Sequence, residues 1–235
     1  METEHILIVG GTSGIGLATA RHLLHNGFDV TISGRSNPNE KELSYLPCDV
    51  RAESSVRELF NLLQGRGLSG LIYSTGITSP PVQITNFEKR VWEKLSETNV
   101  SGALLCLKYA YELLKKSHGR IVIVNSLASR NYSKYSGVEY TMTKSALSGM
   151  VRHLAPQFAK DDVLINSVFP GMTMTPMLIK NIPEEILKEA KASVPLNRLA
   201  EPKDIARVIQ FLISKQNTFI TGSGVDVNGG QFLNG

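Results

Sequence analysis

The stretch "ILIVGGTSGIG", residues 6–16, runs from a short aliphatic segment directly into a loop with glycines at fixed positions. The apolar residues are typical of a buried strand, and the segment from Gly14 to about His25 has the periodicity of a helix. Gly10, Gly14 and Gly16 therefore stand at a strand-to-helix turn. Glycine permits a tight turn there and lets backbone N–H groups approach a phosphate at the helix N-terminus. This context predicts a dinucleotide-binding site.

Beyond this stretch, strand-like apolar runs alternate with helix-like runs along the whole chain. We expect strands at 5–9, 28–33, 43–48, 70–75, 120–126, 163–169 and 224–227. We expect helices at 14–25, 55–63, 87–116, 138–160 and 202–214, and a loop with one short helix at 170–195. This alternation predicts an α/β fold of the Rossmann type, a doubly wound parallel sheet with helices on both faces. The 235 residues contain no repeat or linker, so we expect a single domain over 1–235.

The composition is that of a globular protein, with 42% hydrophobic and 20% charged residues. The N-terminal "METEHILIV" is acidic and leads straight into a strand, unlike a signal peptide, and no apolar run reaches membrane-spanning length. We therefore expect a cytoplasmic protein without a membrane partner. The net charge of +4 is spread along the chain, which argues against nucleic acid as a partner. Cys48 and Cys106 are expected to be buried thiols, and no Cys/His spacing predicts a metal site.

The residues that end the second expected strand bear on the choice of cofactor. A carboxylate at that point would bind the ribose hydroxyls of NAD, whereas this chain has Ser33, Gly34 and Arg35. Arg35 carries the planar fork of donors that suits a 2′-phosphate, and no carboxylate repels that phosphate. We therefore expect NADPH or NADP⁺, with NADH less favoured. The alternative is that Arg35 is an ordinary solvated loop residue.

Two tyrosine–lysine pairs occur at the i, i+4 spacing, Tyr111 with Lys115 and Tyr140 with Lys144. Both pairs would lie on one face of a helix, so the spacing alone does not choose between chemistry and surface packing. Tyr140 follows a strand end and stands at the head of the next helix, where parallel sheets hold ligands. Tyr111 instead leads into the start of a strand. We therefore assign the chemistry to Tyr140 and Lys144 and expect Tyr111 and Lys115 to form a surface pair.

Several further motifs, in a fixed order, make the chain resemble the short-chain dehydrogenase/reductase family over essentially its whole length. Within that family it most resembles 3-oxoacyl-carrier-protein reductases and related ketoreductases. The motifs are "GGTSGIG" (10–16), "CDV" (48–50), "ETNVSG" (97–102), "VNSLAS" (124–129), "YTMTK" (140–144), "NSVFPGMTMT" (166–175), "PLNRLAEPKDIA" (195–206) and "ITGSGVDVNGG" (220–230).

The resemblance implies an NADPH-dependent oxidoreductase that reduces a ketone, such as a 3-oxoacyl or related carbonyl, to a secondary alcohol. It implies Tyr140 as proton donor, Ser126 as the group that polarises the carbonyl, and Asn99 as the holder of a proton-relaying water. Lys144 would bind the nicotinamide ribose and, with the oxidised nicotinamide, lower the pKa of Tyr140 by about 3 units. The cofactor contacts are expected from Gly10, Thr12, Ser13, Gly14, Ile15, Gly16, Ser33, Arg35, Asp49, Val50, Ser74, Gly76, Asn99, Tyr140, Lys144, Pro170, Gly171, Thr173 and Thr175.

The chain departs from the family pattern at a few positions. The family's Asn-Asn-Ala-Gly reads Tyr73-Ser74-Thr75-Gly76, which affects the cofactor contacts expected there and the fit of the adjoining helix. Val9 and Asn228 stand where threonine and aspartate are common. The interval from Ser126 to Tyr140 is one residue longer than usual, so loop 127–139 is expected to have its own shape.

The expected substrate is a small carbonyl compound, free or thioester-linked. Segment 170–195 is expected to be a mobile lid over it, because its methionines and leucines can cover an apolar group. The two positions that hold an acidic carrier in carrier-dependent relatives read Ser117 and Asp161, beside Lys116 and Lys160, which predicts weak carrier dependence. A homotetramer or dimer is expected through the helices at 87–116 and 138–160. The alternatives are an NAD(P)⁺-dependent dehydrogenase of a small secondary alcohol and a non-catalytic NADP-binding regulatory protein.

Overall fold

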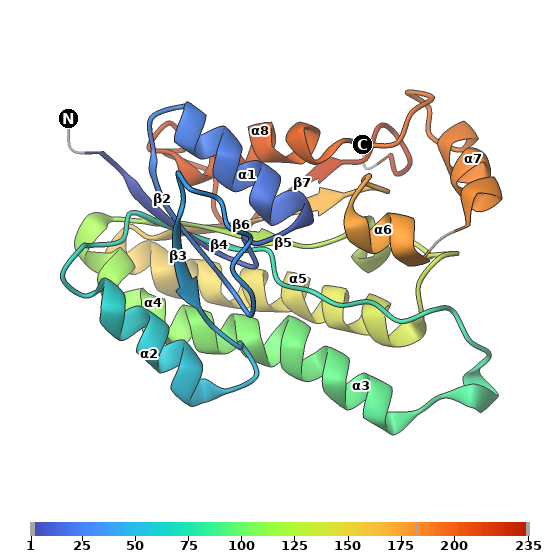
Figure 1. Ribbon diagram of the computed structural model, residues 1–235, viewed down its shortest axis with the longest axis horizontal. Helices are drawn as coiled ribbons and strands as arrows, with labels where there is room; N and C mark the ends of the chain where they lie inside the picture. Colours follow the sequence, from blue (N-terminus) through green and yellow to red (C-terminus); the bar gives the residue numbers. More distant parts are fainter. Residues whose placement is uncertain (1–2, 182, 234–235) are drawn as a thin grey trace.

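A seven-stranded parallel sheet forms the centre of the computed structural model, which describes residues 3–181 and 183–233 (Figure 1). The strand order is β3-β2-β1-β4-β5-β6-β7, and each neighbouring pair is parallel. The strands are β1 (His5–Val9), β2 (Asp29–Gly34), β3 (Ser44–Pro47), β4 (Gly70–Tyr73), β5 (Arg120–Val124), β6 (Leu164–Pro170) and β7 (Gly224–Val227). This topology confirms the predicted doubly wound α/β fold.

Helices cover both faces of the sheet, as the alternation of runs predicted (Figure 1). Helices α1 (Gly14–His25) and α8 (Pro202–Ile213) lie on one face. Helices α2 (Glu53–Leu63), α4 (Gly102–Ser117) and α5 (Val138–Phe158) lie on the other. Short 3₁₀ turns occur at Ile84–Asn86, Leu127–Ser129 and Ala159–Asp161.

Two predicted helical regions differ in detail. The single helix expected over 87–116 is α3 (Lys89–Ser96), a π-helical turn (Glu97–Ser101) and α4. The single short helix expected within 170–195 is two helices, α6 (Pro176–Asn181) and α7 (Glu184–Ala192). Pro183 is the N-cap of α7. Proline lacks the N–H that continuation of a helix needs and is tolerated at a helix start, so the chain divides there.

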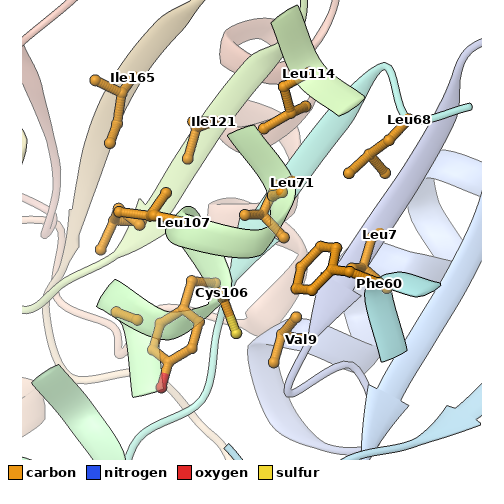
Figure 2. Close-up of a cluster of buried hydrophobic side chains, with 14 of the residues drawn as sticks. Leu7, Val9, Phe60, Leu68, Leu71, Cys106, Leu107, Leu114, Ile121 and Ile165 are labelled. Carbon is orange, nitrogen blue, oxygen red and sulfur yellow. The ribbon is translucent and has the colours of Figure 1, made fainter. Parts of the chain in front are cut away.

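The core consists of two layers, one on each face of the sheet. Alternate residues of β1 point to opposite faces, so Leu7 and Val9 belong to one layer and Ile6 and Ile8 to the other. Figure 2 shows the first layer, in which Leu7, Val9, Leu71 and Ile121 of the strands face side chains of α2 and α4, among them Phe60, Cys106, Leu107 and Leu114. Both cysteines are buried free thiols.

The strand order reverses between β1 and β4, which is the point at which open α/β sheets bind their ligands. The loop after β1 and the loop after β4 therefore diverge at this position. Strands β5 and β6 lie beyond β4 in the sheet.

Candidate active site

The glycine loop after β1 is held between the end of β2 and the segment after β4. The N–H groups of Gly10 and Gly11 donate to the Ser33 carbonyl at 2.8 and 3.1 Å. Gly10 has a φ of +84°, and a Cβ on it would come within 2.5 Å of the Thr75 nitrogen. A Cβ on Gly16 would collide with the Gly10 carbonyl. The backbone packing therefore requires glycine at both positions, and Ser33 lies buried beneath the loop as part of its support.

The segment that follows β6 comes up to the same loop. A Cβ on Gly14 would lie 3.4 Å from the Thr175 methyl group, which places Thr175 beside the start of α1. The Gly171 N–H donates to the Val227 carbonyl at 3.0 Å, and the Thr173 hydroxyl donates to the Gly171 carbonyl at 3.0 Å. The segment after β6 therefore lies beside the start of α1, which follows the glycine loop.

The end of β2 and the turn after β3 carry one residue, Arg51, that the sequence reasoning missed. Asp49 forms an ion pair with Arg51 at 2.5 Å, and this bond, with a smaller contribution from Arg35, lowers the pKa of Asp49 to about 2. Val50 is buried and packs against Gly102. Arg35 itself is exposed at the end of β2. Two guanidinium groups therefore lie near this end of the sheet, whereas the sequence indicated one.

Asn99 lies in the π-helical turn and is fully buried. Its Nδ2 donates to the Ile77 carbonyl at 2.9 Å and to the Thr143 hydroxyl at 3.0 Å, and its Oδ1 accepts from the Ile77 N–H at 2.9 Å. The Thr143 hydroxyl in turn donates to the Tyr140 carbonyl at 2.8 Å. Asn99 therefore joins the segment after β4 to the first turns of α5. A π turn often marks a functional site, but its residues have no sequence signature.

Lys144 is buried and donates from Nζ to the Val124 carbonyl, which ends β5, at 2.9 Å. Burial disfavours the charged amine and lowers its pKa to about 8. Gly76 lies beside it: a Cβ on Gly76 would come within 3.5 Å of Lys144 Nζ and 3.7 Å of Asn99 Oδ1. Glycine at this position keeps side-chain bulk away from both groups.

Tyr140 lies at the start of α5, with its ring centroid 5.7 Å from Lys144 Nζ. Burial raises the pKa of its hydroxyl above the usual value, and an interaction with the Ser126 side chain acts in the opposite direction. In the protein without cofactor, desolvation therefore sets the direction of the shift. The lowering expected from Lys144 together with the oxidised nicotinamide concerns the cofactor complex and stays a prediction.

Ser126 is positioned by a neighbour that the sequence reasoning did not single out. Asn125 is buried, accepts the Ser126 N–H at 2.9 Å and donates to the Ser148 hydroxyl at 2.9 Å. The Ser126 Oγ accepts the Ala128 N–H at 3.1 Å, which caps the 3₁₀ turn that follows. The serine side chain is thus fixed between β5 and α5, on the same side as Tyr140.

The second tyrosine–lysine pair lies elsewhere. The Tyr111 hydroxyl donates to the Asp161 carboxylate, and Lys115 Nζ lies 2.9 Å from the same carboxylate. The Tyr111 ring also stacks on Phe158 at a centroid distance of 4.7 Å. The pair therefore connects α4 to the end of α5 through Asp161 and Phe158. It has a structural role in addition to the predicted position at the surface.

Segment 170–195 is tied down at both ends. Met174 and Ala200 are joined by a backbone hydrogen bond of 2.8 Å, and Lys134 of loop 127–139 pairs with Glu189 of α7 at 3.2 Å. Beside it lies a cavity of about 290 Å³ whose polar lining includes Asp226 and Asn228. These contacts fix the segment between loop 127–139 and the residues before α8.

Comparison with known proteins decides the family. A family model described as Enoyl-(Acyl carrier protein) reductase matches residues 9–231. The chain belongs to the short-chain dehydrogenase/reductase family. It is 30% identical to a 3-oxoacyl-[acyl-carrier-protein] reductase, FabG, of Aquifex aeolicus, over 96% of each chain. It is 27% identical to a 3alpha-hydroxysteroid dehydrogenase of Mediterraneibacter gnavus, over 97% of each chain.

A solved structure of the same kind holds a cofactor. ElxO with NADP bound is 30% identical to the chain and superposes with a TM-score of 0.90, covering 98% of this chain and 99% of ElxO. A tyrosine-to-phenylalanine variant of ElxO is solved with NADPH bound. The chain is therefore an oxidoreductase of a family that uses a nicotinamide cofactor.

The described residues add two observations on other classes of site. Between residues 3 and 181 and between 183 and 233, no helix has both the length and the apolar character needed to cross a bilayer. Within the same two ranges, no three His, Cys, Asp or Glu side chains gather as a group that could hold a metal ion.

Proposed function

We propose that this short-chain dehydrogenase/reductase reduces a ketone to a secondary alcohol with NADPH, and that Tyr140 donates the proton. The observation that carries the proposal is the burial of Lys144 one helical turn from Tyr140, with its amine held at the end of β5. A buried amine with a pKa of about 8 is an uncommon feature for a purely structural lysine, and perturbed pKa values cluster at functional sites.

The cradle around Gly10, Gly14 and Gly16 fits a dinucleotide, because the backbone there excludes any side chain at Gly10 and Gly16. We assign the pyrophosphate to this loop and the nicotinamide side to Gly76, Lys144 and the 170–175 segment. The bound cofactor supplies the hydride that the carbonyl carbon receives.

Each catalytic residue has a proposed role that its contacts support. Tyr140 is protonated at neutral pH because its pKa is raised, so it can give a proton to the carbonyl oxygen. Ser126 donates a hydrogen bond to that oxygen and polarises it. Both amide hydrogens of Asn99 are used by the protein, but its Oδ1 accepts one bond of the two it can take. The remaining lone pair can hold the water that relays protons towards Lys144.

The preference for NADPH over NADH is proposed from the charges at the end of β2. Arg35 is exposed there, and Arg51 lies close by. Arg51 neutralises the nearby carboxylate of Asp49, which would otherwise repel a 2′-phosphate. Arg35 is the group left to pair with that phosphate.

The substrate class is proposed to be small or CoA-linked ketones with weak dependence on an acidic carrier. At the two carrier positions, Ser117 donates to the Leu68 carbonyl at 2.6 Å, and Asp161 is held by Tyr111 and Lys115. A serine and a carboxylate offer an acidic partner no cation, although Lys116 and Lys160 beside them are exposed. A large kinetic preference for a carrier-linked 3-oxoacyl substrate over its short thioester mimic would refute this part.

The whole proposal is tested by following NADPH consumption with a panel of β-ketoesters, diketones and short 3-oxoacyl thioesters. Turnover that Tyr140→Phe abolishes while NADPH binding persists supports it. Turnover of secondary alcohols with NADP⁺, and none of ketones at any pH, would favour the dehydrogenase alternative. NADPH binding without turnover of any substrate would favour a regulatory binding protein.

A further inference from the structure

Tyr73 is the last residue of β4 and stands where the family has the first asparagine of Asn-Asn-Ala-Gly. Its side chain is 1% exposed and points across the core, where Oη donates to the Thr98 carbonyl at 2.5 Å. Thr98 immediately precedes Asn99 in the π-helical turn. A residue that departs from the family pattern thus contacts the turn that carries a proposed catalytic residue.

The π turn changes the hydrogen-bond register at this carbonyl. In an α-helix the Thr98 carbonyl would accept the N–H of Gly102, four residues on. Here the Gly102 N–H bonds to the Glu97 carbonyl instead. Tyr73 therefore supplies a donor to a buried carbonyl whose α-helical donor has been redirected. A buried carbonyl without a donor is costly, so this bond favours the π register over a regular helix.

Gly102 completes the arrangement from the other side. A Cβ at that position would lie 2.7 Å from Tyr73 Oη and 2.8 Å from Val50 Cβ, so any larger residue would displace the hydroxyl. Tyrosine at 73 and glycine at 102 are thus complementary in volume, although they lie on different elements and are far apart in the sequence.

We propose that Tyr73 is a positioning residue that holds the Glu97–Ser101 π turn through the Thr98 carbonyl and thereby fixes Asn99 against Ile77 and Thr143. The inference rests on the proposed function for its catalytic consequence. Asn99 in turn bonds to Thr143, between Tyr140 and Lys144 in α5. Loss of the Tyr73 hydroxyl loosens Asn99 and admits water to Lys144, whose amine owes its lowered pKa to burial.

Tyr73→Phe is the direct test, because it removes the hydroxyl and keeps the ring in the core. Tyr111→Phe is the matched control, since it removes a hydroxyl bound to Asp161 at the other end of α4. For Tyr73→Phe we expect kcat to fall about tenfold at an unchanged KM for NADPH. We also expect the alkaline limb of kcat/KM for NADPH to move up in pH, and amide hydrogens of 97–102 to exchange faster. The control should show none of these changes.

The outcomes separate the inference from the proposed function. A lower melting temperature with unchanged kcat, pH limb and exchange at 97–102 would overturn the inference and leave Tyr73 an ordinary core residue. If the wild type turns over no ketone, the proposed function fails, and faster exchange at 97–102 in Tyr73→Phe alone still supports the positioning role. If Tyr73→Phe does not fold, Gly102→Ala tests the same contact by crowding the hydroxyl, and equal exchange at 97–102 in that variant and wild type would refute it.

Discussion

Lys144 donates a hydrogen bond of 2.9 Å to the carbonyl of Val124, so the amine of α5 is fastened to the last residue of β5. This bond holds a cation in a buried position, with 4% of the residue exposed. Burial penalises the cation, which is why the pKa of the amine lies at about 8 and below its usual 10.5. Burial of the protonated amine therefore reduces the stability of the folded protein, and the size of this effect depends on pH in a range that can be measured.

This cost predicts a pH dependence of stability. The unfolded chain binds the lysine proton more tightly than the folded chain between about pH 8 and 10.5, so stability rises with pH across that interval. From pH 7 to 9.5 the free energy of unfolding of wild type should rise by about 2 kcal/mol relative to Lys144→Met. Urea unfolding of both proteins at the two pH values measures the difference.

Lys115→Met provides the control for this comparison. Its partner Asp161 raises the pKa of Lys115, so the charge is retained in both states over the same interval. The difference between wild type and Lys115→Met should therefore stay flat from pH 7 to 9.5. If the difference between wild type and Lys144→Met is flat as well, the pKa of the Lys144 amine is not lowered in the folded protein.

The two tyrosine–lysine pairs predict opposite results for the same chemical change. Tyr140→Phe should abolish ketone reduction while NADPH still binds, because only the proton donor is lost. Tyr111→Phe should keep its kcat and lose about 1 kcal/mol of stability or less, since its hydroxyl bonds a partly exposed carboxylate. Steady-state kinetics, NADPH fluorescence titration and thermal unfolding of both variants decide the matter. If the two variants have the same kinetics, the assignment of the chemistry to Tyr140 rather than Tyr111 is wrong.

The sequence predicted those features that a local pattern encodes. The aliphatic run 5–9 and the glycines after it specify a strand, a tight turn and a helix by sterics alone, and the structure has all three. The alternation of runs likewise predicted the parallel sheet. The tetramer stays a prediction, although α4 and α5 expose the apolar side chains Leu104 and Met142.

Features that depend on contacts between distant segments could not be predicted. The π turn at Glu97–Ser101 has no residue signature, and the Tyr73 contact that reaches it spans 25 positions. The pairing of Asp49 with Arg51 is local, but it too could not be predicted, because it depends on how the loop after β3 turns. The pKa of Tyr140 was predicted from Lys144 and the oxidised nicotinamide, whereas its direction in the protein without cofactor is set by burial.

The lid expected at 170–195 predicts a change in protease sensitivity. Helices α6 and α7 lie on the surface, and α7 is held to loop 127–139 by the exposed Lys134–Glu189 pair, which contributes little on its own. If the segment orders over the cofactor, limited proteolysis within 170–195 should slow several-fold when NADPH is added, because an ordered segment opens to the protease less often. Cleavage at exposed loop 80–88, away from the segment, is the internal reference. Equal cleavage rates within 170–195 with and without NADPH would show that the segment is a fixed surface loop that does not order over the cofactor.

The cofactor preference can be reversed by design, but the structure changes the design that sequence alone suggests. Arg35→Ala should reduce kcat/KM for NADPH about 10- to 100-fold and leave NADH nearly unchanged, because a charge-assisted bond of about 1.5–3 kcal/mol is lost.

Gly34→Asp should repel the phosphate and bind ribose hydroxyls, yet a Cβ at Gly34 would lie 2.9 Å from both Cγ2 and Oγ1 of Thr12. We therefore expect Gly34→Asp alone to weaken both cofactors by distorting the glycine loop. Thr12→Ala combined with Gly34→Asp removes the two clashing atoms and leaves the Thr12 Cβ at 3.5 Å, an ordinary contact. The double variant should prefer NADH, with Thr12→Ala alone as the control. Steady-state kinetics with both cofactors test this, and a wild type that prefers NADH, or an Arg35→Ala that weakens both cofactors equally, would contradict the assignment of Arg35.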